Sequence, residues 1–526
     1  MPKITMIMST VSMAMMSMNF TAIAQHDPPI NKSESIKISG NPILHALSYS
    51  ESSVGLDQPK WDAGGSELEM ADLNGDGNPD LVSVGDHGSP KINTNMHGIS
   101  VWFGDGDGHW LSFQKGSFGY GGLAIGDVNN DGLLDVGWGV HHDYSNDDFG
   151  NQLMEVALGD GTGKNWTPWD NGLGQDGQSW GMFGTDFADT NADGLLDIAS
   201  VSFGCCDGFH VYHNNGDGTW DHTFGFLNGN SDFEIKHGDI NNDGYPDFVI
   251  AHSQGTVWIN DGAGGFIVGD NNLPANGQSI RRGPDLGDIN GDGFDDISFI
   301  NSNGGIEVWF WDNNTNQWVD ASGDLPTTGS MQTTRLMDMN NDGRLDIITF
   351  GNGRLAIFTG DGKGGWSLAN SFTVPSPGDY SSLAIGDADH NGFPDIAIVS
   401  EKAGGFFGGK NHLQFFRENS QPAFPNIKLT SPAPNRTLIA GAVSSIDWTA
   451  AVPVELQSTT RVSLEWSVDG SAGPWITIAD NLMNNGKHQF IIPTGEPSTN
   501  AYVRATLITT TGRYRSVRGP FTIINK

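Results

Sequence analysis

The chain has 526 residues, including 73 Gly and 24 Pro, and 62 acidic against 26 basic side chains give it a formal net charge of −36 at pH 7. Such an acidic chain is not expected to bind nucleic acid, because the phosphate backbone requires a basic protein surface. Only two cysteines are present, which excludes a fold held together by several disulfides.

The N-terminal segment has the pattern of a secretory signal. One Lys precedes an apolar, Met-rich run, and small residues at Ala22 and Ala24 predict cleavage after Ala24. Ser and Thr make the run too polar for a membrane span; a disordered Met-rich tail is the alternative. We therefore predict a signal peptide over residues 1–24, a linker over 25–41, and a secreted, periplasmic or cell-surface protein with no membrane span in its mature chain.

A nine-residue acidic pattern, D-x-[DN]-x-[DN]-G-x-x-D, recurs seven times at spacings of 49 to 62 residues, beginning at Asp72, Asp127, Asp189, Asp239, Asp288, Asp338 and Asp387. We call these segments acidic loops one to seven. Positions one, three, five and nine carry side-chain oxygens, and Gly at position six allows a sharp turn. Ca²⁺ takes about 6–8 oxygen ligands, so each loop is predicted to bind one Ca²⁺.

The predicted ligands are therefore four residues in each loop, for up to seven Ca²⁺ ions, which would reduce the net charge to about −22. They are Asp72, Asn74, Asp76, Asp80; Asp127, Asn129, Asp131, Asp135; Asp189, Asn191, Asp193, Asp197; Asp239, Asn241, Asp243, Asp247; Asp288, Asn290, Asp292, Asp296; Asp338, Asn340, Asp342, Asp346; Asp387, Asp389, Asn391 and Asp395.

Four short strands are expected in each repeat. In the second repeat these are Leu123–Gly126, Leu134–Val140, Leu153–Leu158 and a fourth strand that starts near Trp166. Short antiparallel strands joined by Gly-rich turns are typical of a propeller blade. An aromatic residue recurs where the fourth strand begins, and we interpret it as packing between blades rather than as a ligand platform. These aromatics are Trp110, Trp166, Trp220, Phe266, Trp318 and Trp366.

The seventh repeat lacks a fourth strand, whereas Ile43–Tyr49 reads as a strand without a partner nearby in the sequence. This N-terminal strand can complete the last blade and so remove an exposed sheet edge. The sequence thus predicts an all-β chain with a seven-bladed β-propeller over residues 42–420, closed by its N-terminal strand. Residues 424–526 alternate apolar and polar segments and predict a β-sandwich, interpreted as a spacer or attachment domain.

The adjacent cysteines, Cys205 and Cys206, favour a vicinal disulfide that stiffens one loop. Two free thiols are the alternative.

The acidic loops, for example Asp127–Asp135 and Asp288–Asp296, and turns such as Asn215–Trp220 resemble FG-GAP repeats, also described as VCBS repeats, of integrin α-chain propellers and secreted bacterial proteins. The resemblance spans roughly residues 42–420. It implies a seven-bladed propeller with Ca²⁺ between the first and second strands, on one face. Loop seven departs from the pattern, because Asn391 replaces the usual Asp while Asp389 supplies a carboxylate. The C-terminal stretch resembles Ig-like or fibronectin-like modules.

The connections opposite the acidic loops are the expected ligand-binding face, because loop variation gives a rigid scaffold its function. His87, His141, His142 and His252 fall there and form a candidate metal or catalytic cluster, with polar loop residues as the alternative.

Basic residues and aromatics near the innermost strands are further ligand-binding candidates. Lys236, Arg281, Arg282 and Arg335 predict an anion site, and ion pairs with carboxylates such as Glu234 and Asp285 are the alternative. Tyr120, Trp180 and Tyr380 could present apolar faces to sugar rings or serve in packing.

Two functions from different classes follow from these candidates, and neither yields an assigned catalytic residue. The first is a Ca²⁺-stabilised extracellular binding or adhesion module for glycans or surface proteins. The second is a polysaccharide lyase, in which His142 or Tyr144 takes a proton and Arg281 or Arg282 neutralises the developing charge. A purely structural adhesin arm is a third possibility.

Overall fold

The computed structural model describes most of the chain after the N-terminal segment. The described residues are 46–56, 67–85, 98–118, 122–140, 148–174, 182–202, 204–205, 208–226, 230–274, 282–351, 353–374, 382–402 and 410–526. They belong to one compact unit, His45–Lys526. The predicted signal peptide and linker lie outside the described residues, as does Cys206.

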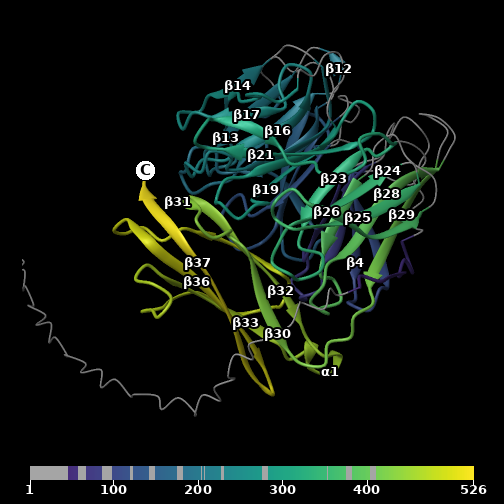
Figure 1. Cartoon of the computed structure of the whole chain (residues 1–526), viewed down its shortest axis with the longest axis vertical. Helices are drawn as coiled ribbons and strands as arrows, with labels where there is room; N and C mark the ends of the chain where they lie inside the picture. The colour runs from purple at the N-terminus through teal and green to yellow at the C-terminus, as the bar shows by residue number, and fades with distance from the viewer. Residues whose placement is uncertain are drawn as a thin grey trace, which may run out of the picture. The chain divides into compact units, whose positions relative to one another are not determined.

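The described chain is built almost entirely of β-strands (Figure 1), which confirms the predicted all-β class. It holds 37 strands and a single helix, α1 (Val454–Gln457), of four residues. Among the described residues, no helix has the length and apolar character needed to cross a bilayer.

Strands β1 to β29, which we call the repeat region, form seven sheets. In order, the sheets contain β2 (Leu68–Ala71), β3 (Asp80–Val84), β4 (Ile99–Gly104) and β5 (Trp110–Lys115); β6 (Leu123–Gly126), β7 (Asp135–Gly139), β8 (Met154–Gly159) and β9 (Trp166–Pro168); β10 (Met182–Ala188), β11 (Asp197–Ser202), β13 (Phe209–Asn214) and β14 (Trp220–Phe226); β12 (Gly204–Cys205), β15 (Asn230–Gly238), β16 (Asp247–His252), β17 (Val257–Asn260) and β18 (Phe266–Val268); β19 (Arg282–Gly287), β20 (Asp296–Ile300), β21 (Ile306–Asp312) and β22 (Gln317–Asp320); β23 (Thr333–Met337), β24 (Asp346–Gly351), β25 (Arg354–Gly360) and β26 (Trp366–Thr373); and β27 (Ser382–Gly386), β28 (Asp395–Lys402), β29 (Lys410–Glu418) and β1 (Tyr49–Glu51).

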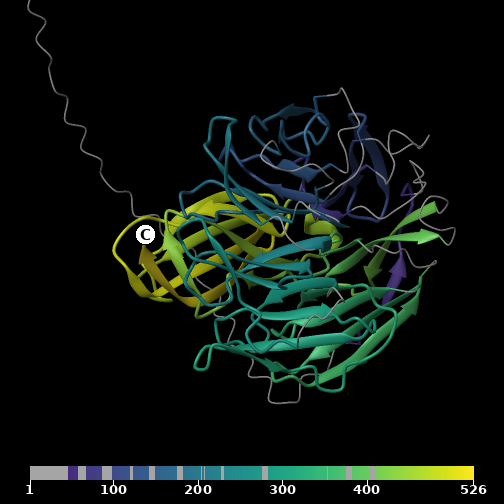
Figure 2. The same cartoon turned by 90° about the horizontal axis from the view of Figure 1, so that it is seen from above.

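The sheets follow one another around a common centre, in a propeller-like arrangement (Figure 2). Their first strands contact in the order β2, β6, β10, β15, β19, β23 and β27, and β27 also contacts β2. In the fourth sheet β12 is an additional edge strand, so we count β15 as its first strand. Each acidic loop then connects the first and second strands of its sheet, and all seven loops occupy equivalent positions in their sheets.

The N-terminal strand β1 lies beside β29 in the seventh sheet, where it takes the place that the fourth strand takes in the other sheets. Tyr49 pairs with Glu418 and Glu51 with Phe416, in antiparallel register. We expected the strand over Ile43–Tyr49, whereas it begins at Tyr49, the last residue of that segment. Leu47, just before the strand, is buried against the sixth and seventh sheets.

The recurring tryptophans lie between neighbouring sheets, as predicted. The Trp220 indole N–H donates to the carbonyl of Trp169, which follows the outermost strand of the preceding sheet, at 2.7 Å. Trp318 and Trp366 make the corresponding bonds, and Trp110 donates to Ser52, just after β1, at 3.1 Å. The same bridge therefore joins the first sheet to the N-terminal strand of the seventh.

Strands β30 to β37, which we call the C-terminal region, form two sheets. One contains β30 (Asn426–Ser431), β32 (Val443–Ala451) and β35 (Lys487–Ile491), and the other contains β31 (Thr437–Ala440), β37 (Gly512–Asn525), β36 (Ser498–Thr509), β33 (Arg461–Ser467) and β34 (Ile476–Leu482). Aromatic side chains of both sheets share one core. Trp466 of β33 lies 6.1 Å from Phe490 of β35 and 6.2 Å from Phe521 of β37, measured between ring centroids.

We expect Trp110→Phe and Trp220→Phe to lower the free energy of unfolding by similar amounts, about 1–3 kcal/mol each, because either change leaves a backbone carbonyl without its indole donor. Urea unfolding of the full chain measures both values. The exposed neighbour Leu111 (68% exposed) provides the control Leu111→Ala, which should change little. A much smaller loss in Trp110→Phe than in Trp220→Phe would mean that the first and seventh sheets are not joined as the others are.

Candidate metal centres and the central ion-pair cluster

Each acidic loop is folded by hydrogen bonds from its own backbone to its first carboxylate. In loop one, the N–H groups of Asp76 and Gly77 donate to Oδ1 and Oδ2 of Asp72. The bond from the glycine at position six recurs in all seven loops. Gly77 has φ of 96°, a left-handed conformation that favours glycine, which explains why the pattern requires this residue.

The ninth-position aspartate fastens each loop to its sheet. Asp80 is fully buried; its Oδ2 accepts the N–H of Leu73 and its Oδ1 accepts the N–H of Gly104 on the third strand, both at 3.0 Å. Both bonds recur in every loop. This residue was predicted only as a metal ligand, and its bond to the third strand was not expected.

Burial makes these carboxylates costly to ionise without a nearby cation. It raises the pKa of Asp80 and Asp197 to about 8 and that of Asp135 and Asp346 to about 7, although backbone N–H donors oppose the shift. The pKa values of Asp247, Asp296 and Asp395 are also raised by burial. A divalent cation would supply the positive charge that these groups lack.

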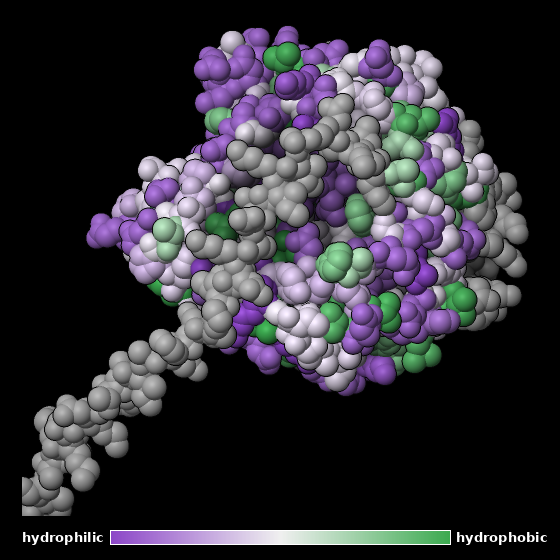
Figure 3. Space-filling view, turned by 60° about the horizontal axis from the view of Figure 1, so that its bottom comes forward, coloured by the Kyte–Doolittle hydropathy of each residue, from purple (hydrophilic) through white to green (hydrophobic). Residues whose placement is uncertain are grey.

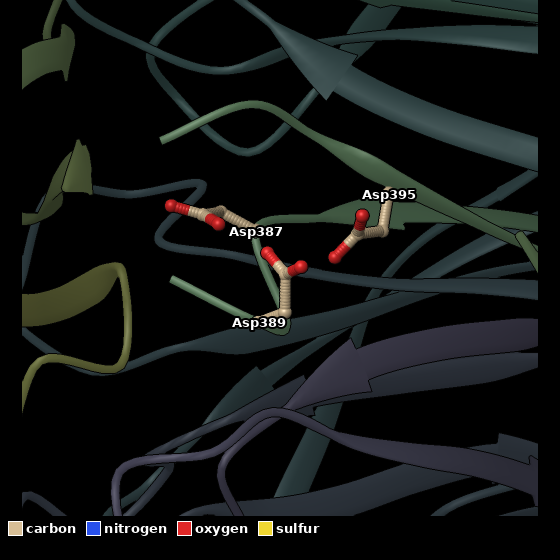
Figure 4. A group of neighbouring side chains, drawn as sticks. All are labelled: Asp387, Asp389 and Asp395. Atoms are coloured by element: carbon tan, nitrogen blue, oxygen red, sulfur yellow. The ribbon is translucent and has the colours of Figure 1, made fainter. Parts of the chain in front are cut away.

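Loop seven brings its three carboxylates closest together (Figure 4). Asp387, Asp389 and Asp395 each place an oxygen within 4.8 Å of the others, which no other group of three acidic, His or Cys side chains does among the described residues. Burial raises the pKa of Asp389 to about 7, and Arg417 lies 3.6 Å from its Oδ2. The departure noted in the sequence therefore moves a carboxylate from position five to position three, where it lies near the first and ninth aspartates.

Two orphaned oxygens support the fit of a cation to these loops. Oδ1 of Asp387, in loop seven, is buried and has no hydrogen-bond partner among the described residues. The side-chain oxygen of Asn191, at position three of loop three, is likewise unpartnered within the described chain. Buried oxygens without donors are uncommon in proteins, and carboxylate and amide oxygens are the ligands that Ca²⁺ prefers. The residues present therefore fit a hard divalent cation.

Every acidic loop is also contacted by the C-terminal region. The backbone N–H groups of Val443 and Ala450 donate to the first aspartates of loops three and seven. The side chains of Asn485 and Gln489 bond to loops one and two. Charged side chains reach loops four, five and six. Sequence reasoning missed these contacts, which fit an attachment domain better than a spacer, the two roles that we considered.

Lys236 is held in a cluster of ion pairs between the innermost strands. Its Nζ lies 3.3 Å from Glu67 Oε1 and 3.0 Å from Glu69 Oε1, which belong to the first sheet. Burial opposes the charge of Lys236, but the two carboxylates raise its pKa above the usual value. Burial raises the pKa of Glu67 to about 7, against the lowering effect of Lys236.

Arg335 is also ion-paired. Its guanidinium lies 3.6 Å from Glu234 and donates to the carbonyl of Thr334 at 2.8 Å. The half-buried Asp285 accepts the N–H of Leu336 nearby. The ion-pair interpretation therefore holds for both described basic candidates, and an anion site at these residues stays a prediction.

Of the histidine candidates, His252 differs from the loop position that we expected. It ends β16, is fully buried, and lies against the rings of Trp258 and Phe226. The position of His252 five residues after Asp247 could not reveal this burial, because the aromatic partners come from other strands. The remaining candidates lie outside the described residues: His87, His141, His142, Tyr144, Tyr120, Trp180, Tyr380 and Arg281. Arg282 begins β19, and only its backbone belongs to the described part of the chain.

Comparison with protein families supports the repeat assignment. The FG-GAP-like repeat model matches residues 72–138, 189–250, 239–299, 288–349 and 338–398, which together cover more than half of the chain. No curated protein matches the sequence.

Solved structures resemble the chain only distantly. A lectin from Agrocybe aegerita that recognises non-reducing terminal N-acetylglucosamine is 18% identical, with a TM-score of 0.40; the match covers 59% of this chain and 80% of the lectin. A protein from Lactobacillus plantarum is 13% identical, with a TM-score of 0.32; the match covers 68% of this chain and 96% of that chain. Neither likeness indicates a function.

We expect Lys236→Met to lower the free energy of unfolding by about 3 kcal/mol at pH 8, because two carboxylates lose their partner. The loss should be less than about half as large at pH 5.5. Folding raises the pKa of Glu67 from 4.5 to about 7. The protonated Glu67 therefore stabilises the folded state fully below pH 4.5, and this contribution is lost as the pH rises through about 7. Urea unfolding at both pH values measures the difference.

The exposed Lys363, in a turn of the sixth sheet, provides the control Lys363→Met. An equal loss in Lys236→Met at both pH values would contradict the assigned role of Glu67.

Proposed function

Because the chain belongs to the FG-GAP-like repeat family, we propose that it is a calcium-stabilised, extracellular binding module for a glycan or a surface protein. The proposal includes a closed, seven-bladed propeller over residues 42–420, followed by an Ig-like β-sandwich over residues 424–526. It also includes secretion directed by residues 1–24.

The recurring acidic loops carry the calcium proposal. Seven loops share the same hydrogen bonds to the first and ninth aspartates, and the ninth is fully buried in each. Asp387, Asp389 and Asp395 would hold Ca²⁺ in loop seven, and the residues at positions one, three, five and nine would do so elsewhere. The ion would supply positive charge to carboxylates that burial disfavours, and so would stabilise the hairpin of each blade.

Two contacts support ring closure. The first strand β2 contacts β27 of the seventh sheet, and Trp110 donates to Ser52 as the other tryptophans donate to their neighbours. Closure removes the exposed edges that an open array of sheets would present.

The surface favours a polar ligand. On the face drawn in Figure 3, hydrophilic side chains predominate and hydrophobic ones are scattered. In the described strands of the repeat region, four large apolar side chains are at least half exposed, but each lies on the fourth strand of a different sheet: Leu111, Ile267, Val319 and Leu368. The C-terminal region contacts the acidic loops, so the connections on the opposite side of the sheets are the proposed ligand face.

Neither of the two basic candidates whose side chains are described supports lyase chemistry. Lys236 and Arg335 are already neutralised by carboxylates, so neither is free to stabilise the carbanion that forms when a uronate loses a proton.

We expect removal of divalent ions with EDTA to lower the melting temperature of the full chain by on the order of 10 °C or more, because several sites contribute together. Calcium should restore the original melt, which differential scanning calorimetry can follow. Magnesium is the control, since it prefers a smaller octahedral site and should restore less. A melt unchanged by EDTA would remove calcium from the proposal.

We expect the full chain in calcium to bind members of a glycan array or extracellular surface proteins without cleaving acidic polysaccharides. Absorbance of unsaturated uronate after incubation with those polysaccharides measures cleavage directly. Absorbance that rises with the wild-type chain, but not with His142→Ala, would identify a polysaccharide lyase and overturn the binding proposal.

A further inference from the structure

The C-terminal region contacts the acidic loops in two chemically different ways. At loops one, three and seven, neutral N–H donors reach Oδ2 of the first aspartate: Asn485 at Asp72, Val443 at Asp189 and Ala450 at Asp387. Their distances are 3.4, 2.9 and 3.3 Å. Such donors orient a carboxylate without neutralising it.

At loops four to six, the contacts carry positive charge. Lys428 Nζ lies 2.5 Å from Oδ2 of Asp338, the first residue of loop six. The guanidinium of Arg436 donates to the carbonyl of Asp239, in loop four, at 2.8 Å and pairs with Asp295, in loop five. Both cations are mostly buried, at 28% and 12% exposed, so solvent screens them only in part.

A third cation lies beside the same loops. Arg518 donates to the carbonyls of Pro432 and Leu429, and it interacts electrostatically with Asp288 and Asp338, the first residues of loops five and six. Loops four to six therefore receive three positive charges from one region of the chain. Among the described contacts of loops one, two, three and seven with the C-terminal region, the donors are uncharged.

We infer that Lys428 and Arg436 are built-in counter-ions of acidic loops four to six, and that they weaken divalent-ion binding there. This inference rests on the proposed calcium binding. Lys428 is bound to one oxygen of a predicted ligand, Asp338, whereas Arg436 lies beside the ligands of loops four and five, at the carbonyl of Asp239 and the carboxylate of Asp295. A positive charge at either place reduces the attraction of the loop for a second cation, because both cations draw on the same negative charge. The C-terminal region would then divide the loops into tight sites, at loops one, two and three, and weak sites, at loops four to six. Loop seven has a cation of its own, Arg417 of the repeat region, beside Asp389.

Lys428→Met tests the inference in the full chain. After chelation, isothermal titration with CaCl₂ should show that loop six of the variant binds Ca²⁺ about tenfold more tightly than in the wild type. Adding Asp342→Asn, which removes a loop-six ligand, should abolish that gain. In EDTA, Lys428→Met should melt below the wild type, and calcium should close most of the difference.

Two variants serve as controls. Lys487→Met removes an exposed lysine from β35 of the same region and should leave both the isotherm and the melt in EDTA unchanged. Lys428→Arg keeps the charge and should reproduce the wild-type isotherm.

The outcomes separate the two proposals. Calcium binding that is equal in the wild type and Lys428→Met, with equal melts in EDTA, would overturn the inference and leave the calcium proposal standing. Flat isotherms for both proteins would overturn the calcium proposal and, with it, the claim about divalent affinity.

Discussion

The fold depends on keeping a carboxylate fully buried at the ninth position of every acidic loop. Each of these aspartates binds the second residue of its loop through one oxygen and the third strand of its sheet through the other. The first three strands of a sheet are thus joined at one side chain, whose charge burial disfavours. Asp80, with a pKa of about 8, shows how strongly the surroundings favour the neutral acid when no cation is near. A cation bound in the loop would relieve that cost without disturbing either hydrogen bond.

The same shortage of positive charge explains where the basic residues lie. The chain has 26 Lys and Arg against 62 Asp and Glu, and those nearest the centre are used to balance internal carboxylates. Lys236 joins the fourth sheet to the first, and Arg335 joins the sixth to the fourth. Because breaking a buried pair leaves a charge uncompensated, such pairs hold sheets in register even when they add little net stability. Basic residues committed in this way are poor candidates for capturing an anionic ligand.

Local patterns in the sequence predicted the acidic loops, the strands around them and the tryptophans between sheets, because each depends on residues within one repeat or its neighbour. Contacts between distant segments could not be predicted in this way. Lys236 and Glu69 are 167 residues apart, and Lys428 and Asp338 are 90 apart, so no local spacing relates them. The burial of His252 was not predicted for a different reason: it depends on ring contacts with Trp258 and Phe226, which its spacing from Asp247 does not indicate.

The contacts of the C-terminal region change how the whole chain can be understood. A spacer would leave the acidic loops exposed to solvent, where calcium binding would depend only on each loop. Here, Oδ2 of several first-position aspartates accepts a donor from the C-terminal region, while Oδ1 faces the loop. One carboxylate thus takes part both in folding the loop and in holding the two regions together. An ion that binds such a carboxylate would act both on the folding of the loop and on the attachment of the C-terminal region. It would do so because a ligand shifts an equilibrium through contacts that differ between the two states. The stability of the repeat region and the attachment of the C-terminal region are therefore coupled through the first aspartates of loops one, three, six and seven.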